Sequence, residues 1–291
     1  MVDIRSISGS GKSSQPLFLR TASVALFNLR TSQRLDIEKL RLKFSAERGI
    51  SSTENQGTLE IYNLSERSRN FANIPPEVKG NQTKDGLFVE LSAGYQGLVR
   101  VILTGNATGG SEYLAPDWVT KLSIIDGGTA LRTRTFQASY GAGFSINRII
   151  LDVVQSFGLP IGYTKSVITT DVVRHGLTLD GLNKKILDDF ASSYGFRWSV
   201  QNGAINLIDK FGGLPQSAVL LTPQTGLLGS PIRTDKGINF RSLLIPLIVP
   251  GCKVRLDKNS VYNGDIIVQK ITISGDTHGS EWSLDVEGTT V

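Results

Sequence analysis

The stretch LRLKFS, residues 40–45, sets the character of this chain, because apolar and polar side chains alternate along it. Leu40, Leu42 and Phe44 would point to one side of an extended backbone and the residues between them to the other. A period of two is typical of a β-strand with one buried face. The stretch therefore predicts a half-buried strand.

The same period returns on both sides of this stretch, from Ala22 to Tyr140. Further examples are TLEI (58–61) and VRVIL (99–103), and clusters rich in Gly, Asn and Ser separate them. Several short strands at such spacing predict an antiparallel barrel or sandwich, here a first β domain over residues 21–140. One short helix is expected over Ser65–Phe71, with Ser65 as its N-cap and Pro75-Pro76 barring its extension.

After Ser145 the apolar period changes from two to that of a helix. Ser145 is a suitable N-cap, and Gly158 and Pro160 end the pattern. The apolar stripe comprises Ile146, Ile149, Ile150, Val153, Val154 and Phe157. A second amphipathic helix is expected from about Asp180, with its stripe at Leu182, Ile186, Phe190 and Tyr194 and its end at Gly195.

A hairpin is expected after the second helix, over Phe196–Ile208, because Asn202-Gly203 is a strong turn sequence between two alternating runs. The change of period predicts an α/β insertion over residues 141–215. From residue 216 to 291 the period of two returns. Alternation at Ile266–Ile273 and at Trp282, Leu284 and Val286 predicts a hairpin that completes a second β domain.

Composition bounds the class of protein. The 291 residues are 40% hydrophobic and 20% charged, with one cysteine, Cys252, so no internal disulfide is expected. No signal peptide or membrane span is recognisable, and we expect a soluble chain made in a cytoplasm. The first 50 residues hold nine of the 31 Lys and Arg and four of the 26 acidic residues, so the net charge of +5 resides there. Without a run of like charges, this region is interpreted as a solvated or interface face.

One motif raises the question of nucleotide binding. GSGKSSQP, residues 9–16, contains Gly11-Lys12-Ser13, the end of a P-loop signature. The position of the first glycine is Ser6, only five residues precede it, and Pro16 lies where the first helical turns should be. Residues 1–20 are therefore interpreted as a flexible basic arm.

The other candidates for chemistry do not converge. His175 and His278 have no second ligand at metal-binding spacing, and a nearby acid such as Asp276 is not enough. Gly275–Gly279 mimics a nucleophile elbow with Thr277 in place of serine, but it joins two strands, so a hairpin loop is favoured. Asp188 and Asp189 are adjacent on a helix and point apart, which favours solvated side chains over an acid/base pair. The three tryptophans, Trp118, Trp198 and Trp282, are assigned to the core. We expect no catalytic, cofactor or metal site.

The order of segments resembles the baseplate hub proteins of tailed phages, particularly those with contractile tails, and the related late-control and type VI secretion spike hub domains. The stretches that carry the resemblance are LEIYNLSERSRN (59–70), LFVELSAGYQG (87–97), VILTGNA (101–107), FSINRIILDVVQSFGLPI (144–161), YGFRWSVQNGAINLID (194–209) and the C-terminal GDIIVQKITISGDTHGSEWSLDVEG (264–288). The resemblance covers most of the chain, from about residue 20 to residue 288, and none of these stretches is a catalytic signature.

The resemblance implies a mainly β fold with two tube-like antiparallel β-barrel domains, over residues 21–140 and 216–291, and a small α/β domain between them. It implies a homotrimeric ring with pseudo-sixfold symmetry in the virion baseplate, placed between the tail tube protein and a central spike or tip protein. Baseplate wedge proteins would surround the ring, and DNA would pass through its channel without sequence-specific binding. No cofactor and no stable membrane insertion are implied.

Two other classes stay open. A receptor- or carbohydrate-binding tail protein would share the β content, although a central helical insertion favours a hub. An enzyme would be an NTPase acting through Lys12 or a hydrolase acting through Thr277 or Ser13.

Overall fold

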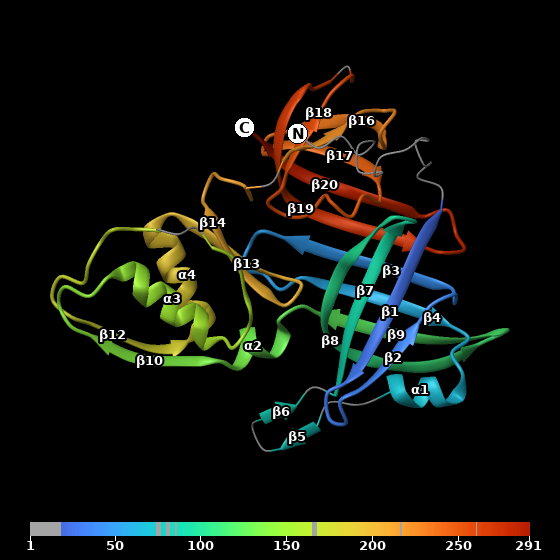
Figure 1. Ribbon diagram of the computed structural model, residues 1–291, viewed down its shortest axis with the longest axis horizontal. Coiled ribbons are helices and arrows are strands. Elements are labelled where there is room, and N and C mark those ends of the chain that lie inside the picture. Colours follow the sequence, from blue (N-terminus) through green and yellow to red (C-terminus); the bar gives the residue numbers. More distant parts are fainter. Residues whose placement is uncertain are drawn as a thin grey trace.

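The structure is a computed structural model that describes residues 19–73, 77–79, 82–84, 86–164, 168–215, 217–259 and 261–291, with side chains left aside at 77–79 and 82–84. It is mainly β, with four helices among the described residues. Figure 1 shows two β regions side by side and an α/β unit that projects from them. The mainly β class with a helical insertion, predicted from the alternation, is confirmed. The GSGKSS stretch and the rest of residues 1–18 of the predicted arm lie outside the described residues, whereas Arg20, its last residue, is already the first residue of a strand.

The first β region forms one antiparallel series of strands, in the order β3-β4-β9-β8-β7-β1-β2. Helix α1 (Glu66–Ala72) begins at Ser65, whose hydroxyl accepts the Ser68 amide, as the sequence predicts. A small separate hairpin consists of β5 (Glu77–Lys79) and β6 (Gln82–Lys84). The strands of the main series are β1 (Arg20–Asn28), β2 (Gln33–Ile37), β3 (Leu42–Gly49), β4 (Gln56–Tyr62), β7 (Leu87–Tyr95), β8 (Leu98–Leu114) and β9 (Asp117–Ile125).

The C-terminal β region has the order β16-β17-β20-β19-β18-β15. All pairs are antiparallel except β15 with β18. Its strands are β15 (Val219–Leu221), β16 (Leu227–Thr234), β17 (Gly237–Leu243), β18 (Lys253–Leu256), β19 (Gly264–Asp276) and β20 (Trp282–Thr290). The predicted hairpin that joins Ile266–Ile273 to Trp282 is confirmed as β19–β20.

The two β regions are hydrogen-bonded to each other. Strand β19 pairs antiparallel with β3, from Lys270 opposite Gly49 to Asp276 opposite Lys43, so all 13 strands belong to one sheet. One apolar core accordingly spans both regions. At the join, the Phe44 ring covers Gly275 and meets the Trp282 ring edge-on, with the two centroids 5.6 Å apart. The boundaries of separate β domains stay a prediction, because this pairing runs across them.

The two β regions repeat one strand order. Six strands of the first region, β1, β3, β4, β7, β8 and β9, correspond in chain order to β15, β16, β17, β18, β19 and β20. Their neighbours correspond as well, because β3-β4-β9-β8-β7-β1 and β16-β17-β20-β19-β18-β15 are the same series. The correspondence is incomplete only at its end, where β1 pairs antiparallel with β7 and β15 pairs parallel with β18. The chain therefore contains two copies of one β unit.

The α/β unit has its own core, in which α3 and α4 pack against each other and against strands. A ribbon of β10 and β12 and a sheet in the order β11-β14-β13 complete it. Phe157 lies buried against Trp198, with the ring centroids 5.6 Å apart. The elements, in order, are α2 (Gly128–Thr133), β10 (Thr135–Tyr140), α3 (Ile146–Ser156), β11 (Ile161–Thr164), β12 (Leu177–Leu182), α4 (Asn183–Tyr194), β13 (Phe196–Gln201) and β14 (Ala204–Asp209).

Most of the local predictions for this unit are confirmed. The stripe from Ile146 to Phe157 is buried, Gly158 and Gly195 have positive φ, and Asn202 and Gly203 turn the β13–β14 hairpin in the left-handed region. Ser145 is the N-cap residue of α3, as predicted, although its side chain makes no capping bond. The predicted start of the second helix, near Asp180, is wrong. Helix α4 begins at Asn183, because Leu177–Leu182 pairs with β10, and Leu182 is 44% exposed.

Candidate interaction surfaces

A buried polar cluster joins the first β region to the α/β unit. The Arg48 side chain on β3 is 3% exposed and donates to the Ile102 carbonyl at 2.7 Å and to Gln201 Oε1 at 2.8 and 3.2 Å. Gln201 on β13 in turn donates to the Gly49 carbonyl at 2.6 Å. The expectation of a solvated or interface face for the basic N-terminal residues is therefore wrong for Arg48.

Two further side chains of the first region hold the β13–β14 hairpin. The buried Asp126 carboxylate accepts the backbone amides of Asn202 and Gly203, both at 2.8 Å. The two amides point to one acceptor because both residues adopt the left-handed turn conformation. Asn55 donates to the Val200 carbonyl at 2.6 Å and accepts the Gly49 amide.

Burial governs the ionisation of the two charged members of this cluster. Burial lowers the pKa of the Arg48 guanidinium to about 10, and the nearby Asp126 charge opposes that shift. Burial likewise raises the pKa of the Asp126 carboxyl above its usual range, against the hydrogen bond from the Gly203 amide and the charge of Arg48. Arg48 thus stays protonated at neutral pH, inside the protein.

The α/β unit also contacts the C-terminal β region. Arg197 on β13 donates to Gln269 Oε1 on β19 at 2.6 Å and to the Gly212 carbonyl at 3.2 Å. The unit is therefore bonded to both halves of the duplicated sheet, on the side where β3 and β19 meet. This arrangement fixes its direction of projection in Figure 1.

The residues around Thr277 form a turn that is bonded to β3. Arg41 and Asp276 form an ion pair at 2.7 Å, and the Thr277 hydroxyl accepts the Leu42 amide at 3.0 Å. The Thr277 hydroxyl also lies 3.0 Å from His278 Nδ1, while the Asp276 carboxylate accepts the backbone amide of His278. The carboxylate is thus bonded to the backbone and to Arg41, where a catalytic triad would bond it to the imidazole. The predicted hairpin loop is confirmed.

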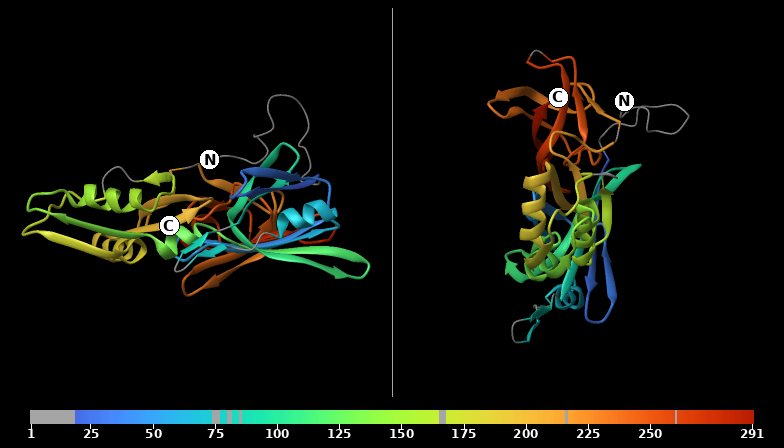
Figure 2. Two further views of the ribbon diagram at one scale, coloured as in Figure 1. Left: turned by 90° about the horizontal axis from the view of Figure 1, so that it is seen from below. Right: turned by 90° about the vertical axis from the view of Figure 1, so that its left-hand side faces the viewer.

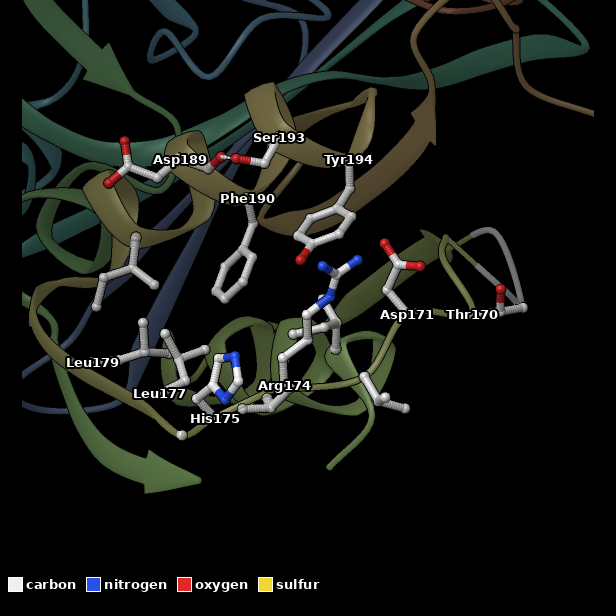
Figure 3. A pocket seen from close by; sticks show the side chains of 15 residues that line it. Thr170, Asp171, Arg174, His175, Leu177, Leu179, Asp189, Phe190, Ser193 and Tyr194 are labelled. Carbon is white, nitrogen blue, oxygen red and sulfur yellow. Dashed lines mark hydrogen bonds between the residues drawn. The ribbon is translucent and has the colours of Figure 1, made fainter. Parts of the chain in front are cut away.

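A pocket of about 830 Å³ opens on the α/β unit, between α4 and the segment 170–177. Phe190 and Tyr194 project from α4 toward Arg174 and His175 on the opposite wall (Figure 3). Within the described part of the chain, no three His, Cys, Asp or Glu side chains gather as metal ligands, here or elsewhere. Asp189 is exposed, as predicted, whereas Asp188 accepts the indole N–H of Trp198 at 2.9 Å.

Apolar side chains are exposed at the tip of the β8–β9 hairpin and along β16. Tyr113, Leu114 and Trp118 lie at the tip of β8–β9, with exposed fractions of 57%, 46% and 39%. Figures 1 and 2 show that this tip extends beyond the rest of the first β region. Leu228 and Ile232 on β16 are 38% and 66% exposed. The expected core position is confirmed for Trp198 and Trp282 and is wrong for Trp118. The Trp118 ring is tilted against that of Tyr113, with the centroids 5.5 Å apart, and lies under the Arg69 guanidinium.

Sequence patterns alone do not reveal these surfaces. Arg48, Asp126 and Gln201 become a cluster only when three distant segments meet, and nothing in their local pattern marks them. The exposed apolar residues lie on strands whose alternation is the same as that of buried strands. The partial signal was the residue pair Asn202-Gly203, whose turn geometry aims two amides at one acceptor.

The chain has the fold of phage tail proteins. It matches the 43 kDa tail protein of prophage MuSo2 from Shewanella oneidensis with a TM-score of 0.62, over 93% of this chain and 97% of that one, at 10% identity. A tail protein from Neisseria meningitidis matches with a TM-score of 0.60, over 92% and 96% of the two chains, at 7% identity. The predicted resemblance is thus confirmed at the level of the fold.

A third similar structure comes from a secretion system. It is a component of the type VI secretion system of E. coli, described as structurally similar to the T4 tail proteins gp27 and gp5, with a TM-score of 0.58. The match covers 87% of this chain and 74% of that chain at 14% identity. No family model and no curated protein sequence matches this chain. No helix among the described residues is long and apolar enough to cross a membrane.

Proposed function

We propose that this chain is a structural baseplate hub protein of a phage tail, with no enzymatic role. Three copies would form a ring that joins the tail tube to a central spike, with wedge proteins around it and a channel through which DNA passes. The observation that carries the proposal is the repeated strand order of the two β regions within one sheet.

The duplication supports a symmetry-adapting role. A chain with two similar β units contributes two similar positions to a ring, so three chains present six. One face of such a ring can meet a sixfold tube while the threefold chain symmetry meets a trimeric spike. The fold comparisons agree with this placement, because the similar structures are phage tail proteins and a component related to gp27 and gp5.

The polar cluster around Arg48 fits the same role. It fixes the α/β unit to the sheet with buried hydrogen bonds, so the unit would project from the ring in one direction. A projecting unit is suited to contact neighbouring baseplate proteins. The virion baseplate is accordingly the proposed location, with synthesis in the host cytoplasm.

The proposal is tested by the mass and image of the purified full chain. Mass photometry across a range of concentrations, followed by negative-stain microscopy, should show three copies in a ring with six β bodies. Immunogold labelling of virions should place the chain at the baseplate. Six copies in the ring, or no chain in the tail, would overturn the proposal.

A further inference from the structure

One half of strand β8 has an unpaired edge. Residues Leu98–Ala107 pair with β7 on one side, but that pairing stops at Ala107. From Thr108 to Leu114 the strand pairs with β9 alone, among the strands that the structure describes. Apart from its β9 partner, this outer half presents its remaining backbone donors and acceptors at an edge, and such edges are templates for pairing with another chain.

The corresponding strand of the second β unit shows what the outer half of β8 lacks. Strand β19 pairs with β18 through Gly264–Ile267, as β8 pairs with β7. Its outer half, Lys270–Asp276, then pairs with β3 of the other unit. Because β19 corresponds to β8 and β3 corresponds to β16, the missing neighbour of β8 is the counterpart of β3, namely a β16 strand.

Strand β16 has the free edge that this pairing needs. It ends the pairing path and pairs only with β17 among the described strands. Its register with β17 shifts between Leu228 and Ile232, so the regular part of the strand is Ile232–Thr234. Ile232 and Arg233 are exposed there. The β16 strand of the same chain does not reach β8, so its partner belongs to a second copy.

We propose that the outer half of β8, Thr108–Leu114, pairs antiparallel with β16 of a second copy of this chain and so repeats between chains the β19–β3 join found within one. The direction follows from the internal join, in which the C-terminal end of β19 lies opposite the N-terminal end of β3. Thr108 therefore lies near Ile232–Thr234 of the neighbouring copy. This inference rests on the proposed function, because it identifies the strands through which neighbouring copies contact each other in the proposed ring.

The alternative edge is less suited to this role. Strand β2 also ends the pairing path, but it carries an exposed Arg34–Asp36 ion pair. Charged side chains on an edge strand are one of the devices that prevent pairing. By contrast, Ile232 on β16 and Tyr113 on β8 expose apolar surface that a neighbouring strand would cover.

Cysteine cross-linking of the full chain tests the contact. Thr108→Cys is combined with Ile232→Cys or with Arg233→Cys, two neighbouring positions that present opposite faces of β16. A short bis-maleimide should give covalent dimers and closed trimers from one of these double variants. The native Cys252 is 1% exposed, and burial raises its pKa to about 12, so it stays unreactive. Matched controls combine Thr108→Cys with Gln33→Cys or Arg34→Cys on β2 and should give no cross-linked dimers or trimers.

The mass of the uncross-linked chain separates this contact from the proposed function. A trimer that cross-links through β2 and not through β16 would overturn the contact and leave the ring standing. Cross-linking through β16 that gives oligomers of more than three copies would support the contact and overturn the trimeric hub. A chain that stays monomeric at every concentration would overturn both.

A single substitution gives a second measure. Ile232→Lys places a charge in the proposed contact and should weaken self-association at least about tenfold, a factor that corresponds to about 1.4 kcal/mol. Phe211→Lys is the matched control, because Phe211 is 85% exposed outside the two edges and its replacement should leave self-association unchanged. Equal effects of the two substitutions would count against the β16 contact.

Discussion

Gly275 is the position where a single methyl group should damage the join between the two β units. It lies opposite Phe44 in the β3–β19 pair, and the Phe44 ring occupies the space above it. A Cβ at residue 275 would lie 2.6 Å from Cε2 of Phe44 and closer still to Cζ. The ring is 3% exposed and packed against Trp282, so it has no free space into which to move.

The cost of Gly275→Ala follows from this overlap. Forcing one extra carbon into a packed core typically costs about 1–3 kcal/mol, and displacing an edge-on aromatic pair costs about 0.5–1.5 kcal/mol more. We expect a loss of about 2–3 kcal/mol in the free energy of unfolding. At about 2–4 °C per kcal/mol for a chain of this size, Tm should fall by about 4–12 °C.

Urea unfolding followed by tryptophan fluorescence, together with a calorimetric Tm, measures this loss. Gly141→Ala is the matched control, because nothing lies within 4 Å of its Cβ position and its φ is ordinary, so its effect should stay within about 0.5 kcal/mol. Phe44→Leu should partly relieve the overlap, so the double variant should be more stable than the sum of the two single losses predicts. A Gly275→Ala chain as stable as the Gly141→Ala chain, or strict additivity with Phe44→Leu, would refute the reasoning.

Three further predictions concern the other contacts. Arg48→Met leaves the Ile102 carbonyl and Gln201 without their donor and Asp126 without a nearby cation. The free energy of unfolding should therefore fall by about 3–5 kcal/mol. Limited proteolysis of this variant should cut first around the α/β unit. The hydrogen bond from Arg41 holds the pKa of Asp276 below its usual value, so the ionised Asp276 stabilises the folded state above about pH 4 and this stabilisation is lost as pH falls through the folded-state pKa. Tm of the wild type should therefore drop more between about pH 5 and pH 3 than Tm of Asp276→Asn. Parallel pH profiles of the two proteins would contradict this. Phe157→Ala removes a ring that is 1% exposed beside Trp198 and should cost about 3–5 kcal/mol, with a changed Trp198 emission, while a loss under about 1 kcal/mol would show that the site collapses freely.

Local patterns predicted the elements well where one residue or period controls the backbone. The α3 stripe, the Ser65 cap of α1 and the Asn202-Gly203 turn all depend on neighbours within a few residues, and all three are confirmed. The start of α4 was misplaced because Leu177–Leu182 satisfies its backbone by pairing with β10, about 40 residues upstream. Alternation alone places Trp118 in the core, whereas its end of the hairpin extends past the neighbouring strands and leaves the side chain 39% exposed.

The sequence by itself determined the mainly β class, the place of the helical insertion and the resemblance to tail proteins, because these follow from periodicity and segment order. Only the tertiary structure decided how the strands pair. It showed that two β units with one strand order share a sheet through β3 and β19, and that β8 and β16 have unpaired edges among the strands described. The physical reason is that strand pairing forms backbone hydrogen bonds between segments more than 200 residues apart. The alternation of side chains along a strand does not specify which other strand will pair with its edge.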